Sequence, residues 1–113
     1  MNKDNNLKKK VDLYFDYFSN KKIEPLISLF SDNILLRDWE IEESGKSDVK
    51  KAFENIFNNT EKIKVNSLNN SLIGSRVYCE IDIIINEKEL LKVVDIIDFN
   101  KDGLIYSIKA FKG

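Results

Sequence analysis

The sequence predicts a single α+β domain in which helices pack on one face of a curved antiparallel sheet. Three stretches with the three- and four-residue spacing of amphipathic helices occupy most of the first half of the chain. Four apolar runs joined by short turns follow them and predict a meander of strands. Helices followed by consecutive strands are typical of the α+β class. A chain of 113 residues is one domain long, and we expect that domain to span 1–113.

The two helices expected first are defined by their apolar positions. The stripe of the first is formed by Leu7, Val11, Tyr14, Phe15 and Phe18. The polar segment 20–22 ends it, and Pro25 then suits the first turn of a second helix. The buried face of that second helix is expected to consist of Leu26, Ile27, Leu29 and Phe30.

A strand over 34–40 is predicted next. The residues expected on its inner face are Ile34, Leu36, Asp38 and Glu40. Trp39 falls on the opposite face, so it is expected to point away from Asp38. Segment 42–45 is predicted as a loop, and Ser47 as the N-cap of a third helix. The apolar positions of that helix are Val49, Phe53, Ile56 and Phe57.

The second half of the chain predicts four strands over 61–68, 72–85, 88–99 and 104–111. The turns 86–87 and 100–103 both suit hairpins. Segment 98–103 imitates the opening of an EF-hand calcium loop, but Lys109 occupies the position of the bidentate glutamate. We therefore predict a hairpin turn there and no metal site.

Composition excludes several classes of function. The chain is 42% apolar and 33% charged, with a formal net charge of −1 and no clustered basic face, so we expect a soluble protein that binds no nucleic acid. We find no signal peptide and no membrane span, and the single cysteine, Cys79, favours a reducing cytoplasm. The absence of histidine removes the commonest general base and a common metal ligand.

Two aspartates are expected to point inward. Asp95 shares a strand face with Val93, Ile97 and Phe99, and Asp38 shares one with Leu36. A buried carboxylate must be paired, hydrogen-bonded or protonated. Each aspartate is therefore either a structural anchor or a functional group, and the pattern alone leaves both interpretations open.

The stretch from Val11 to Asp38, which includes Tyr14 and Pro25, resembles the opening of ketosteroid isomerases without a gap. The stretch from Val94 to Phe111 resembles the last two strands of that family. The wider superfamily is that of nuclear transport factor-like and SnoaL-like domains. The resemblance implies a cystatin-like cone, with three N-terminal helices on a curved antiparallel sheet that encloses an apolar pocket.

The resemblance also implies a mechanism without metal or cofactor. Asp38 matches the general base of the family, and Tyr14 and Asp95 match its two oxyanion-hole donors. The implied reaction is allylic isomerisation of a small apolar enone or ketone through an enolate. We expect the pocket to be lined by Phe18, Phe30, Leu36, Phe53, Phe57, Val93 and Ile97.

Three departures from the family keep a second hypothesis open, a non-catalytic domain that binds a small apolar molecule. Trp39 replaces the usual proline after the base, and Phe53 replaces a tyrosine that supports the oxyanion-hole tyrosine. The loop after the base is acidic and carries Glu40, Glu42 and Glu43. Under either hypothesis we expect a homodimer formed through the sheet face that carries Ile84, Val94 and Ile96.

Overall fold

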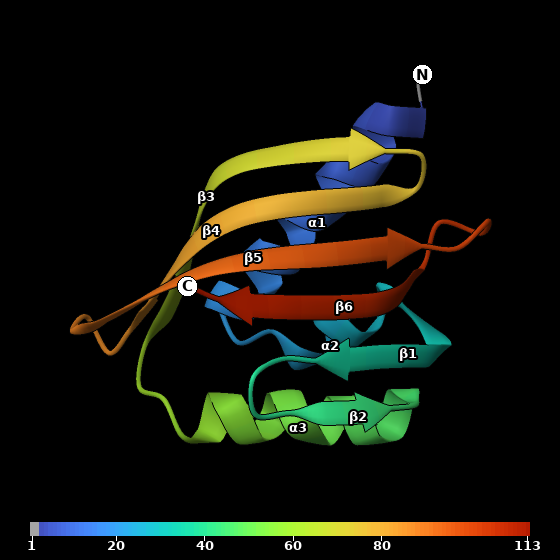
Figure 1. The fold of residues 1–113 in the computed structure, drawn as a ribbon. Coiled ribbons are helices and arrows are strands. Elements are labelled where there is room, and N and C mark those ends of the chain that lie inside the picture. The colour runs from blue at the N-terminus through green and yellow to red at the C-terminus, as the bar shows by residue number, and fades with distance from the viewer. Residues whose placement is uncertain (1–2) are drawn as a thin grey trace.

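The computed structural model describes residues 3–113 and has three helices packed on a curved, open sheet of six strands (Figure 1). This arrangement confirms the predicted α+β class. The helices are α1 (Lys3–Ser19), α2 (Ile23–Ile27) and α3 (Lys46–Asn58). The strands are β1 (Phe30–Arg37), β2 (Glu42–Ser44), β3 (Ile63–Ile73), β4 (Arg76–Ile85), β5 (Glu89–Phe99) and β6 (Ile105–Lys112).

The order of strands across the sheet is β2-β1-β6-β5-β4-β3. Neighbours are antiparallel except for β1 and β6, which run parallel. The helices lie behind the sheet in Figure 1, and the core fills the space between them and the concave face. The strands alternate buried and exposed positions over much of their length, as expected for a sheet with one covered face.

The C-terminal end of α1 is tied to its neighbours by polar contacts. The Ser19 hydroxyl oxygen accepts a hydrogen bond from the backbone N–H of Val65 at 2.9 Å. Lys21 donates to the carbonyl oxygens of Phe57, at 2.8 Å, and of Thr60. A cation is favourable beside carbonyls at the end of a helix, so Lys21 joins the α1–α2 turn to the end of α3.

The second helix is shorter than predicted. It ends at Ile27, and Phe30, expected on its buried face, is the first residue of β1. The backbone N–H of Ile105 donates to the carbonyl of Leu29 at 2.9 Å, and Phe30 pairs with Ile105 in the sheet. Phe30 is buried as expected, but pairing with a strand 75 positions later along the chain decides its conformation.

The predicted strand 34–40 also ends early, at Arg37, and a tight turn follows it. The predicted loop 42–45 contains β2, whose three residues are all exposed and show no apolar alternation. The N-cap of α3 is Gly45 rather than Ser47, with φ +89°, a conformation that side chains disfavour. Its N–H donates to the carbonyl of Ile34, which closes the β1–β2 hairpin against the start of α3.

Strands β3 and β4 meet at a different place from the predicted one. β3 continues to Ile73, and the turn lies at Gly74 with φ +63°. A register shift between Ser67 and Asn69 interrupts the alternation of β3. The polar run in its middle is held in the sheet by pairing with β4, which propensity did not predict.

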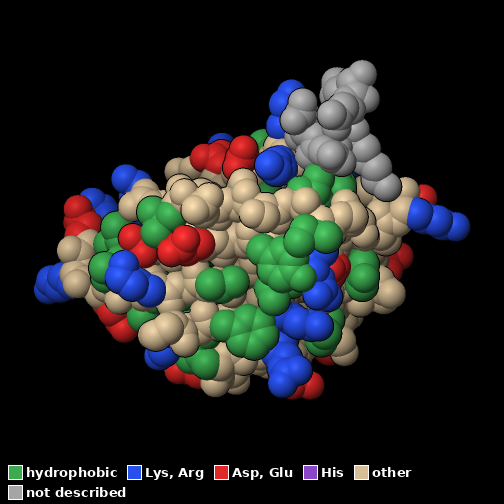
Figure 2. Space-filling view, turned by 45° about the horizontal axis from the view of Figure 1, so that its top comes forward, with side chains coloured by type: hydrophobic (Ala, Val, Ile, Leu, Met, Phe, Trp, Pro, Cys, Tyr) green, Lys and Arg blue, Asp and Glu red, His purple; other side chains and the backbone are tan. Residues whose placement is uncertain are grey.

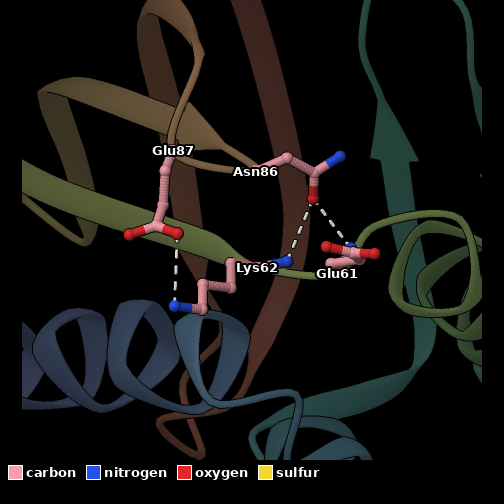
Figure 3. A network of polar contacts seen from close by, with 4 residues as sticks. All are labelled: Glu61, Lys62, Asn86 and Glu87. Atoms are coloured by element: carbon pink, nitrogen blue, oxygen red, sulfur yellow. Dashed lines mark hydrogen bonds and ion pairs between the residues drawn. The ribbon is translucent and has the colours of Figure 1, made fainter.

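A polar clamp closes the end of the sheet where β3 begins, and Figure 3 shows its four residues. The Asn86 side-chain oxygen accepts hydrogen bonds from the backbone N–H groups of Glu61, at 2.7 Å, and Lys62, at 3.0 Å. The Lys62 ammonium contacts the Glu87 carboxylate at 3.2 Å. The predicted hairpin turn 86–87 is therefore also the anchor of the α3–β3 connection.

Candidate active site

The three residues expected to carry the chemistry line one cavity of about 60 Å³. Tyr14 comes from α1, Asp38 from the turn after β1, and Asp95 from the middle of β5. The rest of the wall is mainly apolar and consists of Phe15, Phe18, Leu36, Trp39, Phe53, Ile56, Val65, Ile81, Ile83, Ile108 and Ala110.

Tyr14 is held by an aromatic cluster. Its ring centroid lies 5.4 Å from that of Phe15 and 6.3 Å from that of Phe53, with the Phe53 ring edge-on. Burial, followed by the charges of Asp95, Cys79 and Asp38, raises the pKa of Tyr14 well above its usual value. The phenol is therefore kept protonated and can act as a hydrogen-bond donor.

Asp95 faces the cavity between two side chains that cannot neutralise it. Its cross-strand neighbours are Cys79 on β4 and Ala110 on β6, and its own side chain is 6% exposed. Burial, and to a lesser extent the charge of Asp38, raises the pKa of Asp95 from 3.8 to about 7. A substantial fraction of Asp95 is therefore a neutral acid near pH 7, able to donate a hydrogen bond.

Asp38 is held differently. One oxygen of its carboxylate accepts hydrogen bonds from the backbone N–H groups of Glu40, at 2.7 Å, and Ile41, at 2.6 Å. Its own N–H donates to the carbonyl of Ile41 at 2.8 Å. These contacts form a side-chain-stabilised turn that joins β1 to β2. They orient the carboxylate at the cavity wall and leave its second oxygen as the one available to a ligand.

Three of the seven residues that were expected to line the pocket border this cavity. Phe18, Leu36 and Phe53 line the cavity. The other four belong to the packed core beyond its wall and are Phe30, Phe57, Val93 and Ile97. They were predicted from the inner faces of their elements, but an inner face is longer than the cavity, and only part of it borders open space.

The sequence prediction also missed part of the wall. Ile81 and Ile83 of β4 and Val65 of β3 alternate with outward residues, so period-two patterning could have identified them. Nothing local to Ala110 singles it out. Its place opposite Asp95 follows from the register of β5 with β6.

The predicted orientation of Trp39 is wrong. It was expected to point away from Asp38, but both side chains line the same cavity. Strict alternation applies only within a strand, and β1 ends at Arg37 before either residue. The turn that binds the Asp38 carboxylate brings the two side chains to one side.

Carboxylates dominate the outer side of this turn. Glu40, Glu42 and Glu43 line a shallow cleft that shares Ile56 with the cavity. Arg37 lies 3.9 Å from Glu42 in an exposed ion pair. An exposed pair contributes little, and three carboxylates are gathered on this side of the turn.

A second ion pair with an arginine lies on the other face of the sheet. Arg76 contacts Asp98 with two hydrogen bonds, at 2.7 Å and 3.1 Å, and this pairing was not predicted. Asp98 lies three positions after Asp95 on β5, so it belongs to the opposite face, away from the cavity, as expected. Neither residue lines the cavity.

Residues 3–113 hold neither a cluster of metal-ligating side chains nor a helix suited to crossing a membrane. No three side chains among cysteine, aspartate and glutamate come together there as a bound metal ion would require. None of the helices described is both long and apolar enough to cross a membrane.

Comparison with known proteins finds similarity at the level of structure. No family model matches the chain, and no curated protein sequence matches it. An NTF2-like protein of unknown function from Cytophaga hutchinsonii superposes with a TM-score of 0.81 at 14% identity, covering 95% of this chain and 89% of the other. A Kribbella flavida protein provisionally named a ketosteroid isomerase gives 0.84 at 14% identity, covering 96% and 78%.

A third solved structure is that of SalBIII, described as an epoxide hydrolase/cyclase-like enzyme in pyran ring formation in the polyether salinomycin. It superposes with a TM-score of 0.86 at 16% identity, covering 100% of this chain and 95% of the other. Superpositions this good at identities this low show a shared fold. They do not establish a shared activity.

Proposed function

The chain has the nuclear transport factor-like fold, and on that premise we propose that it is a cofactor-free isomerase of small, uncharged carbonyl compounds. The observation that carries the proposal is that Tyr14, Asp38 and Asp95 line one apolar cavity. Such a reaction needs one proton acceptor and two hydrogen-bond donors, and the three groups differ accordingly. One carboxylate is fixed by backbone donors, while a phenol and a second carboxyl have raised pKa values.

The proposed reaction moves one proton and leaves the atom count of the substrate unchanged. The free oxygen of Asp38 removes a proton from the carbon next to the carbonyl, and the electron pair moves to the carbonyl oxygen as an enolate forms. Protonated Asp38 returns the proton two carbons away, and the carbonyl is restored. A β,γ-unsaturated ketone becomes its conjugated isomer.

Tyr14 and neutral Asp95 would act on the oxygen where the negative charge develops. Donors fixed in an apolar cavity stabilise such a charge more than donors in water do, because little solvent screens them. The raised pKa of Asp95 supports this role, because an ionised Asp95 would repel the enolate. Asp38 would act as the base, since backbone N–H groups fix one of its oxygens and leave the other free to take the proton.

The charge at the entrance supports a neutral substrate. The three glutamates of the neighbouring cleft would repel a phosphate or carboxylate that approached the turn at Asp38. The cavity itself offers no cationic side chain to an anion. We therefore expect uncharged ketones to be accepted in preference to their carboxylated analogues.

The direct test follows ultraviolet absorbance as a β,γ-unsaturated cyclohexenone is converted to its conjugated isomer. The Asp38→Asn variant keeps a side-chain oxygen that can accept from the turn but cannot take a proton. We expect it to lower kcat by about 10²- to 10⁴-fold, the contribution typical of a positioned general base. Asp102→Asn, the same change at an exposed turn position that does not line the cavity, serves as the control. Equal turnover by Asp38→Asn and the wild type would remove Asp38 from the mechanism.

A non-catalytic binding domain is the second candidate. It is favoured by Phe53, which presents no hydroxyl to Tyr14 and contacts it only ring to ring. In this case a neutral apolar carbonyl compound would bind beside Tyr14 and Asp95 without conversion. Binding of cyclohexanone by the wild type, together with no turnover of the cyclohexenone above the Asp38→Asn level, would favour this candidate.

A further inference from the structure

The cavity is small for the kind of ligand its chemistry suits. Its volume is about 60 Å³. An engineered apolar cavity of about 150 Å³ binds a single benzene molecule. The space beside Tyr14, Asp38 and Asp95 therefore holds the reacting end of a ligand. Even a single ring requires the cavity to enlarge, and a fused-ring skeleton requires it to enlarge further.

Most of the wall cannot move outward to enlarge the cavity. Ile81 and Ile108 of the sheet are each 1% exposed and so are packed on both sides. On the helix side the Phe53 ring lies 6.0 Å from that of Phe18 and 6.3 Å from that of Tyr14, both nearly edge-on. Displacing any of these side chains would open a void in a close-packed core.

Trp39 is the exception. It lines the cavity, yet its side chain is 39% exposed, so its ring stands between the cavity and solvent. Two kinds of contact hold the Trp39 ring there, hydrogen bonds of the turn and a cation–π contact. The backbone on either side is fixed by the hydrogen bonds from Glu40 and Ile41 to Asp38, and the Lys112 ammonium lies 5.3 Å from the centre of the ring.

We infer that Trp39 is a specificity-determining residue that sets the upper size limit of the ligand, so that this site takes open-chain or single-ring carbonyl compounds and rejects fused-ring ones. The chemistry of the ligand rests on the proposed function. The size limit rests on the wall alone. Trp39 acts as the outer wall while the carbonyl end of the ligand reaches Tyr14 and Asp95.

The size limit is measured by binding, without turnover. Phenol and 2-naphthol present the same planar hydroxyl on one ring and on two, and both mimic the oxygen of an enolate. We expect the wild type to bind phenol at least about tenfold more tightly than 2-naphthol, the penalty expected when a group does not fit a rigid pocket. Trp39→Ala should reverse this preference by strengthening 2-naphthol binding.

The matched control is Tyr106→Ala. Tyr106 is 40% exposed, nearly the same as Trp39, but does not line the cavity. It should leave the ratio of the two affinities unchanged. Lys112→Met removes the cation over the Trp39 ring and should narrow the preference by a smaller factor than Trp39→Ala does. Circular dichroism spectra confirm that each variant is folded before its affinities are compared.

Three results of the binding measurements would overturn the inference. They are equal binding of both phenols by the wild type, an unchanged ratio in folded Trp39→Ala, and no binding of either phenol. Turnover separates this failure from failure of the proposed function. If phenol binds selectively but the cyclohexenone is not isomerised, the size limit stands and the isomerase proposal fails. If a β,γ-unsaturated ketosteroid is isomerised as fast as the cyclohexenone, the isomerase proposal stands and the size limit fails.

Discussion

Asp95 is the residue whose behaviour depends most on its surroundings. In a peptide it would be ionised at neutral pH, but burial between Cys79 and Ala110 raises its pKa to about 7. Asp38 is half-buried, and one of its oxygens accepts hydrogen bonds from two backbone N–H groups. Two carboxyls that line one cavity thus differ in environment, one being desolvated and the other hydrogen-bonded.

Burial of Asp95 has a measurable effect on stability. Its pKa is higher in the folded chain than the ordinary 3.8, so the folded state binds the proton more tightly than the unfolded state. The stabilising contribution of this proton is present below about pH 4 and is lost as pH rises to about 7. The difference corresponds to roughly 4 kcal/mol.

The prediction is that Asp95→Asn flattens this dependence. Urea unfolding at several pH values should show the free energy of unfolding of the wild type falling between about pH 4 and about pH 8, with a much smaller fall in the variant. Asp102→Asn, in an exposed turn, is the control and should follow the wild type. Parallel curves for Asp95→Asn and the wild type would mean that Asp95 titrates at an ordinary pKa.

At the scale of elements, short polar turns fix how the strands and helices meet. The turn at Asp38 redirects the chain from β1 into β2 and aims two side chains into the cavity. The turn at Asn86 joins β4 to β5 and also holds the start of β3 (Figure 3). Asn86 has φ +54°, a conformation in which asparagine is among the better-tolerated residues.

Replacing Asn86 separates the contribution of its side-chain oxygen to stability from that of its left-handed backbone conformation. Asn86→Gly keeps the backbone conformation accessible but removes the acceptor of two N–H groups, and should lower the free energy of unfolding by about 1 kcal/mol. Asn86→Ala also places a Cβ in the left-handed region and should lower it by about 1 kcal/mol more. Urea unfolding of both variants checks the order. An alanine variant as stable as the glycine variant would show that the left-handed turn carries no penalty.

At the scale of the whole molecule, the helix-free face of the sheet carries several large exposed apolar side chains. Val94 and Phe111 pair across β5 and β6, with exposed fractions of 41% and 56%, and Leu90 on the same face is 52% exposed. Figure 2 shows apolar side chains next to basic ones on the side turned to the viewer. The exposed apolar side chains of this face support the homodimer expected from the sequence, because a contiguous apolar patch on a protein surface often marks an interaction site.

The prediction is that Val94→Asp weakens a dimer that the wild type forms at micromolar concentration. The new charge would be buried unpaired against the second copy, so sedimentation should shift toward the monomer. Leu13→Asp adds the same charge at a 42% exposed position of α1, on the side of the sheet that the helices cover, and should sediment as the wild type does. A wild type that sediments as a monomer would contradict the proposal.

Local pattern and long-range pairing contributed differently to what could be predicted. The stripe of α1 and the strong alternation of β5 follow from spacing alone, and both lie where they were expected. The inward direction of Asp95 follows from the same alternation. The conformation of Phe30 and the existence of β2 depend on distant partners, and here the prediction failed.

The sequence by itself determined the fold class, the inner faces of the helices and strands, and the identity of three polar groups that had to be accommodated near a core. These are properties of period and polarity, which a single segment carries. Only the tertiary structure decided that Tyr14, Asp38 and Asp95 share one small cavity and that Trp39 closes it. Register and turn geometry place those side chains, and both are fixed by hydrogen bonds between residues far apart in the chain or beyond the end of a strand.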